Sequence, residues 1–328
     1  MALNKEQEKW LAKINRDEKS VTKVPEELLT EEFCLTVVQE SGGALRHLPN
    51  KLKTEAVCLA AVQGNGRALE FVPDAKKTDA LCLAAVQQDG FAFDYVPAAK
   101  KTAAVCLAAV QKYGSYLEHV PDKLKTEAVC LAAVQANGSA LEYVPAAKKT
   151  EALCLAALQN GGAFEFVPDA LKTGGFYLAA ARQGSCALED VPGKLKTEAI
   201  CLAALIQNDS AREHIPEDLK AKVEAALKKA FSTEALCLAE VRQSGRALRY
   251  VPENFKTGAV CLAAVQQARA GALEFVPEHL KTAELCFEAL KQHTGYYRGS
   301  DPYQLVPEGL RDEVRGKVDA YRAECSGA

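Results

Sequence analysis

At 328 residues, the chain is long enough for two ordinary domains or for one extended repeat array. Hydrophobic residues make up 48% and charged residues 25%, as in ordinary soluble globular proteins, and the longest apolar runs, such as AVCLAAV, are too short to cross a membrane. The formal net charge of -3 gives no broad electrostatic reason to bind nucleic acid or an anionic membrane surface.

The N-terminus mixes both charges and has no apolar stretch before a small-residue cleavage site, so we expect no signal peptide. Its first 22 residues are predicted to form a capping helix, with Trp10, Leu11 and Ile14 on one face. The 12 cysteines occur in a chain that is long enough to bury a core without disulfides. We therefore expect reduced thiols and a cytoplasmic location.

A phrase such as KTEAVCLAAVQ then recurs along the chain, with a cysteine in its middle. That central position is occupied in turn by Cys34, Cys58, Cys82, Cys106, Cys130, Cys154, Tyr177, Cys201, Cys237, Cys261 and Cys286. The first five steps are 24 residues each, and a set of prolines keeps the same period. So regular a period is the signature of a solenoid, in which each unit buries its apolar surface against its neighbours. The predicted fold is an all-α solenoid of about eleven repeats.

One repeat shows the expected elements. Thr54 is a good N-cap for a main helix, and the segment from Val57 to Val62 is apolar on every side, which indicates a helix held between neighbours. Gly66 is expected to end this helix in the left-handed conformation. Residues 67–72 are predicted to form a second, short helix, which Pro73 stops.

The period breaks after Pro216, where twelve additional residues are rich in strong helix formers. We expect this insertion to extend the short helix of the eighth repeat. The predicted organisation is a capping helix over 1–22, repeats one to eight over 23–207, a helical insertion over 208–231, three last repeats over 232–307 with a longer loop at 293–303, and a C-terminal capping helix over 308–328.

The pattern VPxxLKTxxxCLxAVxxNGxAL, as in VPDKLKTEAVCLAAVQANGSAL at residues 120–141, resembles the helical repeat family catalogued as domain of unknown function 4116. The resemblance extends from Val24 to about Pro307, with departures at the seventh repeat, which reads GGFYLAAAR, and at the insertion. It implies a tandem α-helical repeat protein and brings no assigned activity or site residues.

Two sets of polar residues recur with the repeat. The cysteines lack the close spacing of metal ligands, so we interpret them as small core residues, and we expect Cys325, near the C-terminus, to be the exposed thiol. A lysine precedes most of the threonine caps, at Lys53, Lys77, Lys101, Lys125, Lys149, Lys172, Lys196, Lys256 and Lys281. These lysines are expected to line one edge, either as a positive ridge or as a solvated edge that nearby acids such as Glu70 compensate.

A third position, two residues before each repeat proline, is mostly aromatic. We name its residues the aromatic row, which consists of His47, Phe71, Tyr95, His119, Tyr143, Phe166, Asp190, His214, Tyr250 and Phe275. A position that accepts Asp as well as Phe is not expected to be fully buried, and half-exposed rings can stack on bases or peptide side chains. The loop at 293–303 adds Tyr296, Tyr297, Arg298 and Tyr303, residue types that are favoured in interface hot spots.

No catalytic or cofactor fingerprint occurs in the sequence, and the five histidines are scattered. We therefore expect no enzyme, no cofactor and no metal, but a binding scaffold or a subunit of a larger assembly that is monomeric by itself and has another protein as its partner. The alternative is single-stranded nucleic-acid binding through the aromatic row and the lysine edge. A third option is an enzyme that uses Cys325 or a histidine.

Overall fold

A computed structural model describes residues 3–291 and 301–326 of the chain, in which helices and turns occur and no strand does. The described chain falls into two compact units, Met1–Leu171 and Lys172–Ala328. In this part of the chain, no helix is both long and apolar enough to cross a bilayer. The predicted all-α class is confirmed.

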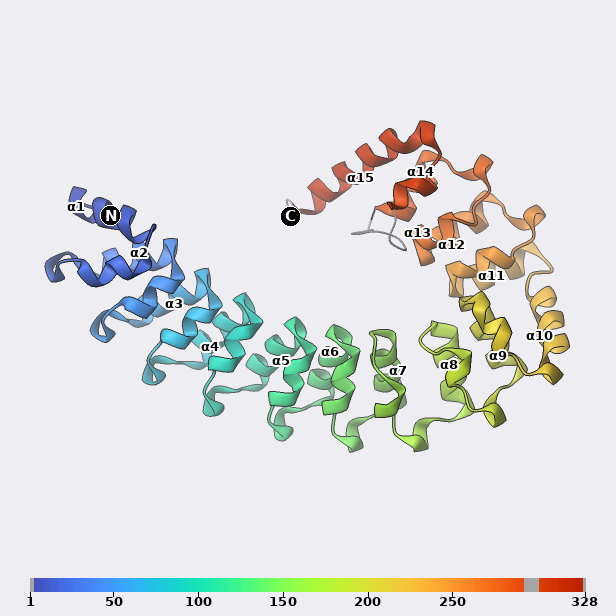
Figure 1. The fold of residues 1–328 in the computed structure, drawn as a ribbon, viewed down its shortest axis with the longest axis horizontal. Coiled ribbons are helices and arrows are strands. Elements are labelled where there is room, and N and C mark those ends of the chain that lie inside the picture. Colours follow the sequence, from blue (N-terminus) through green and yellow to red (C-terminus); the bar gives the residue numbers. More distant parts are fainter. Residues whose placement is uncertain (1–2, 292–300, 327–328) are drawn as a thin grey trace. The chain divides into compact units, whose positions relative to one another are not determined.

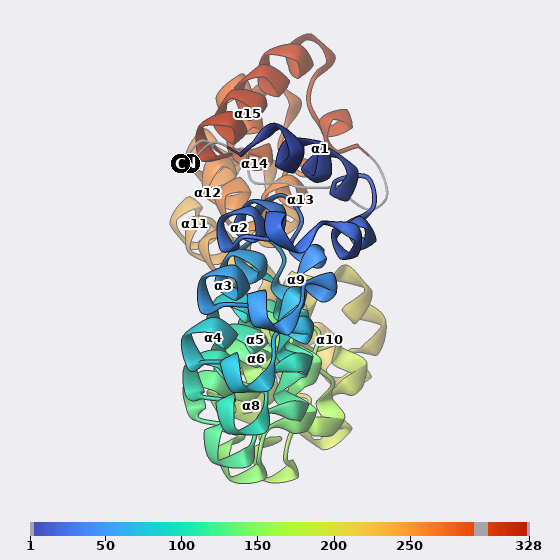
Figure 2. The ribbon, with the colours of Figure 1, turned by 90° about the vertical axis from the view of Figure 1, so that its left-hand side faces the viewer.

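The first unit is a stack of regular repeats. Its α-helices are α1 (Lys5–Ile14), α2 (Glu31–Glu40), α3 (Glu55–Gly64), α4 (Asp79–Gln88), α5 (Ala103–Lys112), α6 (Glu127–Ala136) and α7 (Glu151–Gln159). Helices α2 to α7 are the main helices of six repeats and lie side by side in chain order (Figure 1). Seen from the side, α2, α3 and α4 lie one above another (Figure 2). The predicted solenoid packing is thereby confirmed.

The second unit holds the remaining repeats. Its α-helices are α8 (Gly174–Gln183), α9 (Glu198–Gln207), α10 (Glu217–Ala230), α11 (Glu234–Gln243), α12 (Gly258–Ala268), α13 (Ala270–Leu273), α14 (Ala283–Leu290) and α15 (Arg311–Ser326). The main helices are α8, α9, α11, α12 and α14, and with the six of the first unit they make eleven. Helix α15 packs on α14 and covers the last repeat.

The second helix of each regular repeat is a 3-10 helix of six residues. These short helices are η3 (Gly42–His47), η5 (Gly66–Phe71), η7 (Gly90–Tyr95), η9 (Gly114–His119), η11 (Gly138–Tyr143), η17 (Asp209–His214) and η18 (Gly245–Tyr250). A three-residue 3-10 turn follows the repeat prolines other than Pro216, as in η6 (Asp74–Lys76). In the sixth repeat, Gly161 adopts a φ of 82° and the short helix shrinks to η13 (Phe164–Phe166).

Every main helix begins at a threonine, as the sequence predicts. The Thr54 hydroxyl oxygen, for example, accepts a hydrogen bond from the Val57 backbone N–H at 3.3 Å, and the same contact occurs at the start of the other ten main helices. This bond satisfies one of the free N–H groups at the helix start. In the helix that follows this cap, four residues are buried against the neighbouring repeats: Val57, Cys58, Ala61 and Val62.

The glycine that begins most regular short helices, such as Gly66, does not end the main helix in the left-handed conformation that we expect from the sequence. Gly66 is not left-handed, because among the described residues only Gly161, Gly184 and Arg269 have a positive φ. A Cβ atom at Gly66 would lie 2.3 Å from the Ala85 carbonyl oxygen at the end of α4. The glycine is therefore required by the close approach of the next main helix. Asn65 caps the short helix instead, and its side-chain oxygen accepts from the Arg67 N–H at 3.1 Å.

The insertion also differs from expectation. The short helix of the eighth repeat, η17, keeps its six residues. The additional residues form the separate helix α10, which takes the place of the three-residue turn after Pro216. The reason is that Ile215 and Pro216 have extended backbone angles, so the helix restarts after them, and Val223 and Leu227 then bury one face of α10.

These contacts predict that Gly66→Ala lowers the free energy of unfolding by about 1–3 kcal/mol, because the added methyl group overlaps the backbone of α4. Gly64→Ala is the matched control, since the nearest atom to its added Cβ is 3.8 Å away. It should be neutral or stabilising by up to about 1 kcal/mol, because alanine is the better helix former. Urea denaturation followed by circular dichroism measures both, and equal effects would contradict the close-approach explanation.

Candidate binding surfaces

The aromatic row lies at the ends of the short helices and is partly exposed, as expected. In the first unit, Phe71, Tyr95, Tyr143 and Phe166 are half-buried and His119 is exposed. In the second unit, Tyr250 and Phe275 are half-buried. Each of these side chains precedes a buried valine, so the row marks the rim of the core.

Several rings of the row meet a charged side chain of the preceding repeat. The Arg46 guanidinium carbon lies 5.5 Å from the Phe71 ring centre, and that of Arg249 lies 4.9 Å from the Phe275 ring centre. The Glu118 carboxylate raises the pKa of the Tyr143 hydroxyl, mainly through its negative charge. The row therefore also links successive repeats, by cation–π and hydrogen-bond contacts.

Two candidate contact residues, Tyr250 and Tyr303, already use their side chains in contacts within the chain. The Tyr250 hydroxyl lies 3.0 Å from the Leu205 carbonyl oxygen and 2.7 Å from Asp209 Oδ1, and burial raises its pKa. The half-buried Tyr303 has the Arg315 guanidinium 4.9 Å from its ring centre. Tyr296, Tyr297 and Arg298 lie outside the described residues.

The lysines that precede the threonine caps, which we call the lysine row, do not form an exposed edge. This corrects the expectation from the sequence. Lys53, Lys77 and Lys125 are each less than 9% exposed, and their ammonium groups donate hydrogen bonds to the backbone carbonyls of aromatic-row residues. The Lys53 Nζ atom lies 2.8 Å from the Phe71 carbonyl oxygen, and the Lys125 Nζ atom lies 3.2 Å from that of Tyr143. Lys101, Lys149 and Lys196 make the same contact.

The physical reason is that the last carbonyls of a helix lack a partner within the helix and carry partial negative charge, which an ammonium group satisfies. The lysines also pair with acids other than those expected. Lys77 pairs with Asp74 at 2.9 Å, and Lys125 with Asp122 at 3.1 Å, so the acid just after the proline compensates the charge. Each such lysine fastens the short helix of its own repeat.

The cysteines in the middle of the repeated phrase, which we call the cysteine ladder, lie in the core, as predicted. All ten ladder cysteines are buried and all twelve cysteines of the chain are free thiols. Burial raises the pKa of Cys34, Cys261 and Cys286 to about 11. The Cys58 thiol donates to the Lys53 carbonyl oxygen at 3.6 Å, which gives this position a use for sulfur that alanine lacks. Cys325 is exposed.

An exposed aromatic cluster occurs in the first unit, at positions that vary between repeats. The Arg67 guanidinium carbon lies 4.4 Å from the Phe91 ring centre, and the Phe91 and Tyr113 ring centres are 4.5 Å apart. Phe91 and Tyr113 are about two-fifths exposed. The sequence marks these positions as variable, but their contact appears only when three successive repeats are stacked.

A further surface was not anticipated from the sequence. The residue after each ladder cysteine points away from the core, and on helices α3 to α7 these residues form what we call the leucine face, which consists of Leu59, Leu83, Leu107, Leu131 and Leu155. Leu59 and Leu131 are each 37% exposed, and the others are half-buried. Exposed alanines such as Ala56 and Ala128 flank them. The five main helices α3 to α7 thus present an apolar surface that no other described residue of this unit covers.

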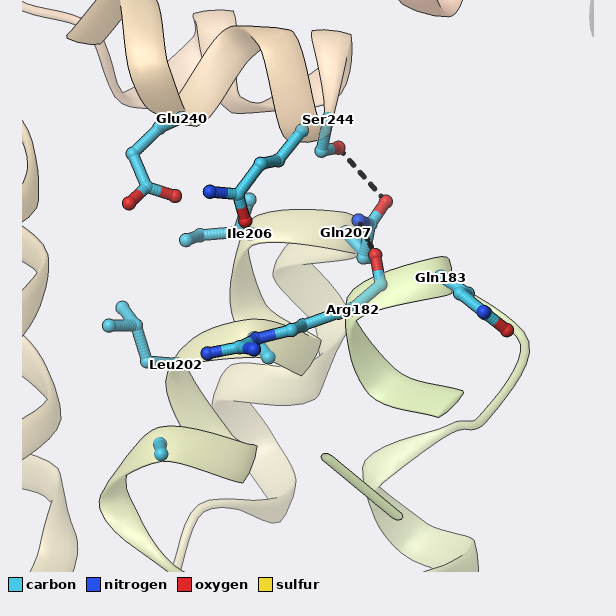
Figure 3. Close-up of a pocket in the computed structure, with 10 residues that line it drawn as sticks. Arg182, Gln183, Leu202, Ile206, Gln207, Glu240 and Ser244 are labelled. Atoms are coloured by element: carbon cyan, nitrogen blue, oxygen red, sulfur yellow. Dashed lines mark hydrogen bonds between the residues drawn. The ribbon is translucent and has the colours of Figure 1, made fainter. Parts of the chain in front are cut away.

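The second unit contains a pocket of about 400 Å³ between the end of α8, one face of α9 and the end of α11 (Figure 3). Its rim is fixed by hydrogen bonds. The Ser244 hydroxyl lies 3.0 Å from Gln207 Oε1, and Gln207 Nε2 donates to the Arg182 carbonyl oxygen at 2.6 Å. We name this cavity the α9–α11 pocket.

In the described residues, no group of three His, Cys, Asp or Glu side chains is placed to hold a metal ion.

Comparison with protein families bears on the origin of the repeats. The family model for a domain of unknown function, DUF4116, matches residues 30–76 and 105–147. Two regions of the chain are therefore similar to DUF4116. Each matched segment spans two repeats of the first unit, one from the Thr30 cap to the end of η6 and the other from within α5 to η12 (Ala146–Lys148). No curated protein and no solved structure matched the chain.

In the second matched segment, Lys125→Met should lower the free energy of unfolding by about 1–3 kcal/mol, because the Tyr143 carbonyl loses a charged donor while the apolar stem is retained. Lys123→Met, at an exposed lysine in the turn before it, should change stability by less than about 0.5 kcal/mol. Chemical denaturation of the full chain compares the two. Equal small effects would mean that the lysine row is a solvated edge after all.

Thiol labelling tests the cysteine ladder. A maleimide at neutral pH should react fast with Cys325, because this side chain is exposed, and slowly with the ladder cysteines, because burial raises their pKa and blocks access. All 12 thiols should react after denaturation. Cys325→Ser should remove the fast phase. Fast labelling of several thiols in the folded variant would contradict the buried ladder.

Proposed function

We propose that the protein is a non-enzymatic binding scaffold, or a subunit of a larger assembly, that contacts a partner protein along its repeat surface. The observation that carries this proposal is the leucine face. Its leucines recur at the same position of five successive main helices and nothing in the first unit covers them. Contiguous apolar surface of this kind is typical of interaction sites.

The charges beside the leucine face favour a protein partner. Several main helices of the first unit begin with an acid, as at Glu55, Asp79, Glu127 and Glu151, one turn before the residue that belongs to the leucine face. A partner segment with an apolar stripe and a basic margin fits this surface, whereas a phosphate backbone is repelled by it. The aromatic row remains a second proposed contact surface of the same scaffold.

The nucleic-acid alternative has less support from the structure than from the sequence pattern. It requires cations beside the aromatic row, and lysines at that place, such as Lys53 and Lys125, are buried and bonded to backbone carbonyls. It stays an untested prediction. We also propose that the chain is monomeric by itself and resides in the cytoplasm, where the free thiols would remain reduced.

The proposal predicts that Leu59→Glu together with Leu131→Glu abolishes capture of a protein partner from the native lysate. Each leucine contributes about 1.5–3 kcal/mol when fully buried, so two charges at these positions should weaken binding more than tenfold. The fold should persist, because both side chains point away from the core. Capture is carried out with and without nuclease, and bound proteins are identified by mass spectrometry.

The matched control is Ala99→Glu with Ala147→Glu, which adds the same charges to exposed turns away from the leucine face. Binding that survives nuclease, is lost in the leucine variant and persists in the control supports the scaffold. Binding that vanishes with nuclease, and also with Tyr95→Ala plus Tyr143→Ala, moves the function to nucleic acid. No captured macromolecule, or equal capture by all variants, contradicts the proposal.

A further inference from the structure

The insertion of α10 changes the packing of the two repeats on either side of it. Elsewhere in the second unit, consecutive main helices pack directly, as α8 does on α9 and α11 on α12. Helix α10 packs on α9, and the direct contact between α9 and α11 is almost lost. The α9–α11 pocket occupies the place of that contact, and its volume of about 400 Å³ lies in the range of small-ligand sites.

Two residues of the pocket depart from the repeat. Glu240 occupies the position that Ala61, Ala85 and Ala133 hold in the first unit, where the alanine is completely buried. Arg182 occupies the position of the glutamine in the regular phrase, as in Gln63. The regular packing has no room for a glutamate, and here the displaced neighbour leaves space for one.

The Glu240 and Arg182 side chains extend into the pocket, where the described residues give their charged groups no hydrogen-bond partner. Figure 3 shows the Glu240 carboxylate entering from α11 and the Arg182 guanidinium from α8, with Leu202 and Ile206 of α9 beside them. Among the described residues, neither charged group has a hydrogen bond or an ion pair. Glu240 is half-buried, and burial raises its pKa, although the positive charge of Arg182 counteracts this.

A half-buried carboxylate is costly without a cationic partner, and a guanidinium is well shaped to hold a carboxylate through two hydrogen bonds. Leucine and isoleucine side chains beside them suit a short methylene chain. We propose that the α9–α11 pocket binds an ω-amino carboxylate, with its ammonium group on Glu240, its carboxylate on Arg182 and its methylene chain over Leu202 and Ile206.

Two sources present this chemistry. One is a free ω-amino acid, and the other is a lysine at the C-terminus of a protein, which carries its ε-ammonium and its α-carboxylate on one chain. The proposal depends on the second unit alone and not on the leucine face, so it can fail while the scaffold proposal stands.

Titration calorimetry of the full chain with 6-aminohexanoate tests the site. We expect saturable binding at millimolar concentration or below, with hexanoate and 6-aminohexanamide at least about tenfold weaker because each lacks one charge. Nα-acetyl-lysine, which mimics a C-terminal lysine, is the second probe. Tighter binding of acetyl-lysine assigns the site to protein C-termini, and tighter binding of 6-aminohexanoate assigns it to a free metabolite; both support the proposal.

The variants restore the regular repeat, so both are expected to fold. Glu240→Ala and Arg182→Gln install the residues that the first unit carries at these positions, and each should weaken 6-aminohexanoate at least about tenfold. Arg242→Gln, at a neighbouring position of α11 that does not line this pocket, should bind as the unchanged chain does. The proposal would be overturned if neither probe bound, if hexanoate and 6-aminohexanamide bound as tightly as 6-aminohexanoate, or if binding were unaltered in both pocket variants.

Discussion

In most repeats, the short helix approaches the end of the next main helix so closely that only glycine fits at its first position. A Cβ atom at Gly114 or Gly138 would lie about 2 Å from a carbonyl oxygen of the next helix. Main helices held at this spacing need small side chains between them, and the buried Ala61 and Cys58 provide them. The 24-residue period follows from this contact, because each copy must present the same surface to an almost identical neighbour.

This packing determines which side chains are available for function. The lysines lie in every regular copy, but the carbonyls at the end of each short helix need donors, so their ammonium groups are used inside the repeat. The cysteines are likewise enclosed. The exposed chemistry of the first unit is therefore apolar and aromatic, with the leucine face on the main helices and the cluster of Arg67, Phe91 and Tyr113 at their ends. Such a surface suits recognition of a protein better than recognition of a phosphate backbone.

Polar chemistry appears where the repeat is interrupted. Glu240 stands at a position that regular packing reserves for a buried alanine, and it is accommodated because α10 displaces the helix that would cover it. An insertion of twelve residues thus does more than lengthen the array. The α9–α11 pocket beside it places two opposite charges next to an apolar wall.

The sequence by itself determined the all-α class, the eleven repeats, the threonine caps and the buried cysteines, because these depend on contacts made identically in each copy and so appear as a period. It misassigned the lysine row and Gly66, since periodicity does not show which carbonyl a long side chain reaches or how near a neighbouring backbone lies. The leucine face, the Arg67–Phe91 contact and the α9–α11 pocket were decided by the tertiary structure alone. Each depends on which surfaces stacking leaves uncovered, and that is a property of neighbours in space rather than in sequence.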